Sequence, residues 1–198
     1  MNQKKQFIIS SLDNLSSACE NLKNNEIFLK KYNSWIKIFI STICNDGTIF
    51  ICGNGGSFAH SQHLTTELVV RFNINREPIR AICLGASQSN LTAIGNDFSF
   101  DQIFIRELSA LYKPNDTVFI LSTSGNSQNV IKVAEYVRSM GGNALSLIGK
   151  DGGQLKNLTD NFIIPFSSTS LIQELQFLIG HSICDELEKY VVRKPKND

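Results

Sequence analysis

The chain has 198 residues, of which 42% are hydrophobic and 19% charged, an ordinary globular balance that argues against intrinsic disorder. Nineteen basic against eighteen acidic residues give a net charge of +1, so the strong positive field that attracts nucleic acid or an anionic membrane is missing. The N-terminal sequence lacks the apolar core of a secretory signal, and no apolar run approaches the ~18 residues that span a bilayer. We expect a cytoplasmic protein without a nucleic-acid or membrane partner.

Few residues are available for metal or acid–base chemistry. The five cysteines lie far apart and include no CxxC pair, which argues against a disulfide framework or a thiolate zinc site. Only three histidines are present, and they are His60, His63 and His181. An enzyme that needs imidazole near neutral pH therefore has few candidates.

The first 46 residues are predicted to be helical. Residues 2–46 contain no proline or glycine, and their apolar residues recur near the 3.6-residue period of an α-helix. Lys23, Asn24 and Asn25 are expected to separate two helices, and Asp46-Gly47 to end the second. The sequence thus predicts a helical N-terminal segment, 1–46, ahead of an α/β core over 47–198 that ends in a helix.

The core alternates between short apolar runs and longer amphipathic stretches. The apolar runs have the length and composition of buried parallel strands, and they are 48–52, 79–84, 117–121, 144–148 and 161–165. Helices are expected at 57–71, 88–112, 127–140, 151–158 and 170–192. This alternation predicts a doubly wound five-stranded parallel sheet flanked by helices. Because no linker or repeat interrupts the pattern, we expect a single domain over 1–198.

Two segments that follow predicted strands are suited to binding an anion, because ligands in such sheets bind at the carboxyl ends of the strands. Residues 53–57, Gly-Asn-Gly-Gly-Ser, lead into a helix, and glycine lets the backbone approach a ligand closely. They are not a Walker loop, because GK[ST] is absent. Residues 122–127, Ser-Thr-Ser-Gly-Asn-Ser, place four hydroxyl groups at a helix start, which favours a phosphate monoester site over a simple N-cap.

Two helices carry candidate metal ligands or proton-transfer groups. His63 and Glu67 lie four residues apart on one helix face; a solvent-exposed pair is the alternative, but their position after the glycine loop favours chemistry. Gln173 and His181 interrupt an apolar stripe on the last helix and are ~12 Å apart along its axis. Either Gln173 precedes the regular helix, or one site collects its groups from two subunits. His60 has no comparable partner in the sequence, and we expect it to be structural.

Five ordered motifs carry a resemblance to a known family: GNGGSxxxxQHxxxELxxRF (53–72), AIGNDFSFDQIF (93–104), STSGNSxNV (122–130), GKDGG (149–153) and IQExxxxxxH (172–181). Together they resemble the phosphoheptose isomerase family, which has the sugar isomerase (SIS) fold, over nearly the whole chain. The resemblance implies an aldose–ketose isomerase that converts sedoheptulose 7-phosphate to D-glycero-D-manno-heptose 7-phosphate. This is the first step towards nucleotide-activated heptose for lipopolysaccharide or capsule.

The resemblance also implies roles for individual residues. Substrate contacts are implied for Asn54, Gly55, Gly56, Glu67, Asn96, Asp97 and Gln173, and phosphate contacts for Ser122, Thr123, Ser124 and Ser127, with Ser57 nearby. One zinc ion per subunit is implied at His63, Glu67, Gln173 and His181. The family forms homotetramers with active sites at subunit interfaces. Our hypothesis is that Glu67 transfers the carbon proton and that His181 transfers protons at the sugar oxygens.

Two other interpretations remain to be weighed. Some SIS-fold proteins, such as the one that associates with the replication initiator DnaA, bind partners without catalysis, but they lack the glutamate and histidine found here at Glu67 and His181. A sugar-phosphate-sensing regulator would need a DNA-binding segment that does not fit in 198 residues of this charge balance. The chain departs from the family at 167–170, at Leu171 and at Gln176, where arginine and histidine are common at the last two positions. We expect these departures to affect substrate positioning more than the reaction class.

Overall fold

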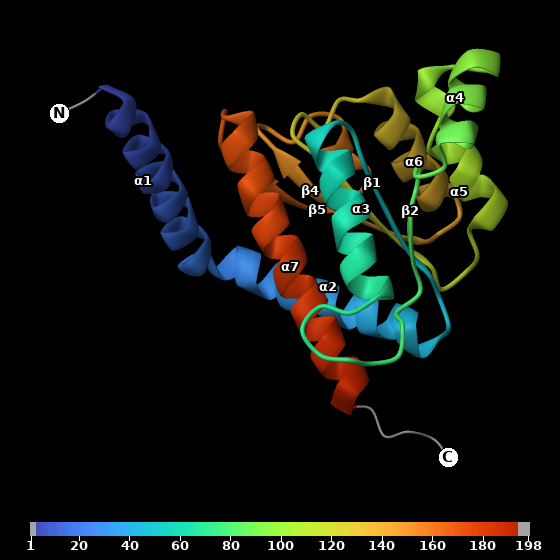
Figure 1. The fold of residues 1–198 in the computed structure, drawn as a ribbon. Helices are drawn as coiled ribbons and strands as arrows, with labels where there is room; N and C mark the ends of the chain where they lie inside the picture. Colours follow the sequence, from blue (N-terminus) through green and yellow to red (C-terminus); the bar gives the residue numbers. More distant parts are fainter. Residues whose placement is uncertain (1–2, 194–198) are drawn as a thin grey trace.

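A five-stranded parallel sheet forms the centre of the computed structural model, which describes residues 3–193 (Figure 1). Its strands are β1 (Ile49–Gly53), β2 (Ala81–Cys83), β3 (Thr117–Ser122), β4 (Asn143–Gly149) and β5 (Asp160–Ile164), in the order β2-β1-β3-β4-β5. All four pairings are parallel, so the predicted doubly wound sheet is confirmed. The chain winds in opposite directions from β1 and from β3, which makes the crevice at their carboxyl ends the expected ligand site.

Helices cover both faces of this sheet. On one face lie α1 (Gln3–Lys23), α2 (Glu26–Cys44), α3 (Gly56–Val69) and α7 (Thr169–Arg193); on the other lie α4 (Gln88–Asp97), α5 (Ile105–Leu111) and α6 (Gln128–Ser139). Strand alternation builds the two cores: Ile49 and Ile51 face one, whereas Phe50 and Cys52 face the other. None of the described helices is long and apolar enough to cross a membrane.

The two N-terminal helices differ in how they pack. The predicted break is confirmed, because α1 ends at Lys23 and the Asn25 side chain caps α2 by accepting from the Phe28 N–H at 2.9 Å. In α2, Trp35 and Phe39 are buried against the sheet. The first half of α1 instead projects from the body with its apolar residues in solvent, and Phe7, Ile8 and Leu12 are 74, 57 and 58% exposed (Figure 1).

Two predicted helices are wrong in extent. The stretch 88–112 divides into α4, a short 3-10 helix η1 (Phe100–Gln102) and α5, because the backbone of Ser99 is extended and interrupts the helical conformation between α4 and η1. The stretch 151–158 is mainly turn, with only the 3-10 helix η2 (Leu155–Asn157). Positive φ angles of 58°, 84° and 51° at Lys150, Gly152 and Gly153 prevent a right-handed helix there.

The cysteines are free thiols, and Cys52, Cys83 and Cys184 are buried. Burial raises the pKa of Cys83 and of Cys184 to about 12, with a smaller contribution from a nearby glutamate in each case. Both thiols are therefore neutral at pH 7, and Cys52 and Cys184 serve as small apolar side chains in the two cores.

Candidate active site

The loop after β1 presents mainly backbone to the crevice. Gly55 has φ 54°, a left-handed conformation in front of α3, and nothing lies within 4 Å of where its Cβ would be. A Cβ on Gly56 would lie 2.5 Å from Nε2 of Gln173, so glycine there lets α7 approach the loop. Ser57 is only 2% exposed and its hydroxyl lies 3.4 Å from Oε1 of Gln176, so it faces the interior. The Ser57 hydroxyl is thus not available to a ligand, whereas backbone N–H groups of the loop are.

The loop after β3 has the form of an anion cradle. The Ser122 and Ser124 hydroxyls accept from the N–H groups of Gly125 and Asn126 at 3.0 and 3.3 Å and so stiffen the turn. Ser127 is the N-cap residue of α6 but makes no side-chain cap bond, which leaves its hydroxyl free for a ligand. Free N–H groups at a helix start and hydroxyls beside them bind phosphate without any lysine or arginine.

The GKDGG segment, residues 149–153, packs against the backbone of this cradle. Gly125 has φ 65°, and a Cβ there would lie 2.2 Å from the carbonyl oxygen of Gly152. A Cβ on Gly153 would in turn lie 2.6 Å from both the Ser124 carbonyl oxygen and Oδ1 of Asn126. The two backbones therefore touch, and the glycines of both motifs are needed for that close approach.

Three of the predicted metal-ligating or catalytic side chains come together between α3 and α7. Nε2 of His63 lies 3.1 Å from Nε2 of His181 and 3.1 Å from Oε1 of Glu67. His63 is about half exposed, whereas the Glu67 side chain is 18% exposed. A carboxylate and two imidazoles at hydrogen-bonding distance can pass protons to and from a bound sugar.

Phe177 organises the rings around this group. It stacks on His60 with ring centroids 4.3 Å apart and an interplanar angle of 13°, and its centroid lies 4.1 Å from that of His181. Burial, and then the neighbouring His63, lowers the pKa of His181, with Glu67 acting in the opposite direction. A neutral imidazole at pH 7 can both accept and donate a proton. His60 was expected to be structural, and its buried Nδ1 has no hydrogen-bond partner among the described residues.

Gln173 lies away from the histidines. The helix α7 is continuous from Thr169, so the option that Gln173 precedes the regular helix is wrong. Gln173 touches Gly56 instead, ~12 Å along the helix from His181. Imidazole nitrogens and a carboxylate oxygen are donors of the type that zinc takes. Within residues 3–193, however, no three His, Cys, Asp or Glu side chains form a ready group that could hold a metal ion.

Asn96 and Asp97 are also apart from the other candidates. Both are exposed at the C-terminal end of α4, where the Asn96 amide donates to Oδ1 of Asp97 at 2.8 Å. Among the described hydrogen bonds, none connects either residue to the loops or to the histidines. A single chain therefore does not assemble every predicted site residue.

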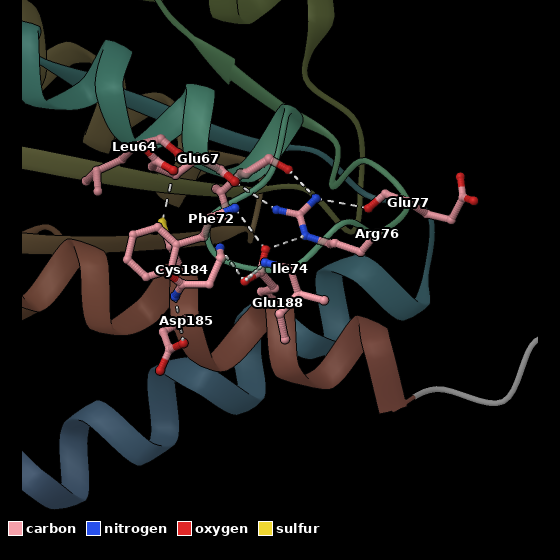
Figure 2. A network of polar contacts seen from close by, with 11 residues as sticks. Leu64, Glu67, Phe72, Ile74, Arg76, Glu77, Cys184, Asp185 and Glu188 are labelled. Carbon is pink, nitrogen blue, oxygen red and sulfur yellow. Dashed lines mark hydrogen bonds and ion pairs between the residues drawn. The ribbon is translucent and has the colours of Figure 1, made fainter.

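A buried ion pair anchors the segment that follows α3 (Figure 2). The Glu188 carboxylate on α7 accepts from the backbone N–H groups of Phe72, Asn73 and Ile74 at 2.8, 2.7 and 3.0 Å, and lies 3.5 Å from Nε of Arg76. Burial alone would raise the pKa of Glu188, but the three N–H donors and Arg76 hold it below its usual range. Glu188 is therefore an anion at neutral pH.

Arg76 connects this ion pair to the helix that carries Glu67. Its guanidinium donates to the carbonyl oxygens of Leu68 and Glu67 at 2.7 and 2.8 Å (Figure 2). These carbonyls belong to the last turn of α3, where a cation is favoured by the helix dipole, and that of Leu68 also accepts from the Ile79 N–H at 3.0 Å. The backbone of the Glu67 turn is thereby fixed to α7.

Comparison with known proteins identifies the chain. A family model described as SIS domain matches residues 13–149. The phosphoheptose isomerase of Helicobacter pylori (strain HPAG1) is 44% identical over 156 residues, which are 78% of this chain and 81% of that protein. The chain belongs to the phosphoheptose isomerase family. A further phosphoheptose isomerase, from Clostridium acetobutylicum, is 36% identical over 186 residues, or 93% and 95% of the two chains.

Solved structures of this family agree with the fold. Phosphoheptose isomerases from Neisseria gonorrhoeae and Francisella tularensis superpose with a TM-score of 0.87 each, at 29% and 30% identity. The two superpositions cover 94% and 96% of this chain, respectively, and the whole of each solved chain. The predicted SIS fold and the predicted isomerase class are both confirmed for this family member, and the binding-protein alternative is not favoured.

Two residues that support the loops escaped the sequence reasoning. Gln176, recognised only as a departure from the family, is fully buried and donates to the carbonyl oxygens of Ser122 and Leu147 at 3.2 and 2.8 Å, which ties α7 to the ends of β3 and β4. Asn129 is 1% exposed and exchanges two hydrogen bonds with Asn54. Its position inside the STSGNSxNV motif was the available signal.

Proposed function

We propose that the protein isomerises sedoheptulose 7-phosphate to D-glycero-D-manno-heptose 7-phosphate. The observation that carries the proposal is the placement of Glu67 and His181, from two helices, next to the same His63 nitrogen. The names of its relatives support the substrate, and the hydroxyl-lined turn before α6 supports a phosphate ester.

The reaction moves one proton between neighbouring carbons through a cis-enediolate. In the proposed mechanism the Glu67 carboxylate removes a proton from C1 of the ketose and returns it to C2, which gives the aldose. The neutral His181 imidazole carries the matching proton from the C1 hydroxyl to the C2 oxygen, so no net charge is left on the sugar. The lowered pKa of His181 keeps it in the form that can do both.

Phosphate binding is assigned to neutral donors. Ser127 offers a free hydroxyl at the start of α6, and the adjoining turn offers backbone N–H groups. Ser122 and Ser124 hold the shape of that turn through their own hydrogen bonds to it. Such a site needs no lysine or arginine, in keeping with the net charge of +1.

We further propose a zinc ion at this site. His63, Glu67 and His181 would hold it, with Gln173 as the fourth ligand, and the ion would polarise the sugar carbonyl. Because a bound cation lowers the basicity of a carboxylate ligand and occupies the lone pair of an imidazole ligand, the metal competes with the proton-transfer roles of Glu67 and His181. Since α7 keeps Gln173 ~12 Å from His181 of the same chain, the fourth ligand would come from a second copy.

We also propose a homotetramer with shared sites, since the separation of Gln173 from His181 in one chain supports a site that takes residues from two copies. Phe7, Ile8 and Leu12 on α1 form an exposed apolar face, and Phe98 and Phe100 beside Asn96 and Asp97 are 54% and 59% exposed. Contiguous apolar surface of this kind is typical of subunit interfaces. Assembly would bring to one site the predicted site residues that lie apart in a single chain, which are Gln173, Asn96 and Asp97. We place the enzyme in the cytoplasm, where its product would serve lipopolysaccharide or capsule heptose.

The substitution Glu67→Gln tests the proposed chemistry. Turnover of sedoheptulose 7-phosphate, followed by NMR, should be abolished, because glutamine cannot accept the carbon proton, while the oligomeric state is retained. Glu135→Gln is the matched control, since Glu135 is exposed on α6, and it should keep full activity. Near-normal turnover by the Glu67→Gln protein would contradict the assignment.

A further inference from the structure

Asn54 and Asn129 form a reciprocal amide pair across the crevice between β1 and β3. Asn54 Nδ2 lies 2.9 Å from Asn129 Oδ1, and Asn129 Nδ2 lies 2.8 Å from Asn54 Oδ1. Asn54 belongs to the glycine loop after β1, whereas Asn129 is the second residue of α6, next to the phosphate cradle. The pair therefore joins the two ligand-binding segments directly.

The backbone of α6 decides which way round this pair is oriented. Taken alone, two paired carboxamides could exchange oxygen and nitrogen together without losing a hydrogen bond. The Val130 N–H, one of the orphan donors in the first turn of α6, donates to Oδ1 of Asn129 at 3.0 Å. The oxygen of Asn129 must therefore stay on that side, its Nδ2 must face Asn54, and the orientation of Asn54 follows.

Burial makes this arrangement obligatory. Asn129 is 1% exposed, so water cannot replace Asn54 as the partner of its amide. Asn54 is only partly buried, and after pairing it still has one N–H hydrogen on Nδ2 and one lone pair on Oδ1. Those two groups are what Asn54 can offer to a sugar bound in the crevice.

We propose that Asn129 is a positioning residue, which fixes the orientation of the Asn54 carboxamide towards the carbohydrate part of the substrate. The inference rests on the proposed function, because it takes Asn54 to be a sugar contact. Asn129 itself does not touch the substrate. It transmits the fixed geometry of the first turn of α6 to the loop after β1.

A double-mutant cycle tests this role. The values of kcat and KM for sedoheptulose 7-phosphate are measured for Asn54→Ala, Asn129→Ala and the double variant, together with inhibition by inorganic phosphate. Asn129→Ala should lower kcat/KM about tenfold or more, as misplacement of a binding group does. The double variant should be no worse than Asn54→Ala alone, and the inhibition constant for phosphate should stay unchanged in Asn129→Ala. Losses that multiply in the double variant, or a parallel loss of phosphate affinity, would overturn the proposal.

Two further variants separate positioning from folding. Asn129→Asp keeps the acceptor for the Val130 N–H and so keeps the helix start, but it cannot donate to Oδ1 of Asn54; its kcat/KM should fall although it remains folded. Asn161→Ala removes an asparagine amide that donates to the Lys156 and Thr159 carbonyls at 2.8 and 2.9 Å near the amino end of β5, and it should keep wild-type activity. Full activity of Asn129→Asp would refute the role of the donated bond.

A crystal structure of Asn129→Ala tests the positioning claim apart from the reaction. The carboxamide of Asn54 should turn away from its present orientation or become disordered. An unchanged Asn54 would overturn the inference whatever the substrate is. If the unaltered enzyme does not convert sedoheptulose 7-phosphate while Asn54 does turn in the variant, the proposed function fails and the positioning role stands.

Discussion

Replacing Glu188 by glutamine removes a buried negative charge with little change of shape. The carboxylate accepts three backbone N–H groups from the segment after α3 and faces Arg76 at 3.5 Å, and the two side chains are only 1% and 2% exposed. In the variant, the new NH2 group must face at least one of those N–H donors, and Arg76 loses its counter-charge.

The expected loss of stability is large. Removing one partner of a buried ion pair costs about 3–5 kcal/mol, because the other charge stays buried without compensation. The guanidinium of Arg76 keeps its bonds to the Leu68 and Glu67 carbonyls, which places the expected loss near the lower end, about 3 kcal/mol. That is a substantial part of the ~5–15 kcal/mol by which domains are stable.

The difference in stability between the unaltered protein and the Glu188→Gln variant should also depend on pH. The pKa of Glu188 is held below its usual range, so its stabilisation is fully present above about pH 4.3, the ordinary value for glutamate. The stabilisation is lost as the pH falls through the lowered folded-state pKa. The loss of unfolding free energy caused by Glu188→Gln should thus have its full size at pH 7 and become smaller in acid.

Urea unfolding followed by circular dichroism measures the effect, at one fixed protein concentration because assembly shifts apparent stability. Asp185→Asn is the matched control, since Asp185 lies on the same helix and pairs with Lys189 at 2.5 Å in a half-exposed i,i+4 contact. It should cause only a small loss. A loss in Glu188→Gln no larger than that in Asp185→Asn would refute the assigned role of the buried pair.

Three further predictions follow from the site. Gly125→Ala should raise KM for the sugar phosphate and lower stability, because the φ of Gly125 is 65° and the new Cβ would lie 2.2 Å from the Gly152 carbonyl oxygen. Gly141→Ala is the control: its φ is 66° with nothing within 4 Å of the new Cβ, so it should lose about 1–2 kcal/mol through strain without a change in KM. The same KM in the Gly125→Ala and Gly141→Ala proteins would contradict the phosphate cradle. Mixed oligomers of Glu67→Gln and Gln173→Ala proteins should regain about a quarter of the activity by random assembly if each site takes Gln173 from a second copy, and no recovery after confirmed mixing would argue against shared sites. Dialysis against a zinc chelator should lower turnover and added zinc should restore it, whereas undiminished turnover by metal-free protein would count against the ion.

Much of the fold was predictable because its signals are local. The apolar run at 117–121 lies within β3, and the polar break at Asn24 and Asn25 separates α1 from α2. The failures are local as well. Apolar residues continue through 88–112 with a helical period, but an extended Ser99 interrupts the helix, and periodicity alone does not report backbone conformation.

The site was predictable where motif spacing and helix geometry coincide. The four-residue spacing of His63 and Glu67 predicts that both lie on one face, and the polar interruption of the last helix indicates His181, which the packing of α7 against α3 brings to 3.1 Å from His63. The supporting contacts were not predictable, because they join residues that lie far apart in sequence. Asn54 meets Asn129, and Arg76 meets Glu188, only once the sheet has formed.

Isomerisation of a seven-carbon ketose phosphate is the activity that we propose for this chain. The direct measurement is to incubate the purified protein with sedoheptulose 7-phosphate, and separately with unphosphorylated sedoheptulose, and to follow both by NMR. We expect D-glycero-D-manno-heptose 7-phosphate to accumulate from the phosphorylated sugar and the unphosphorylated sugar not to react. An unchanged spectrum of sedoheptulose 7-phosphate, in the presence of zinc and with the protein folded and assembled, would contradict the proposed activity.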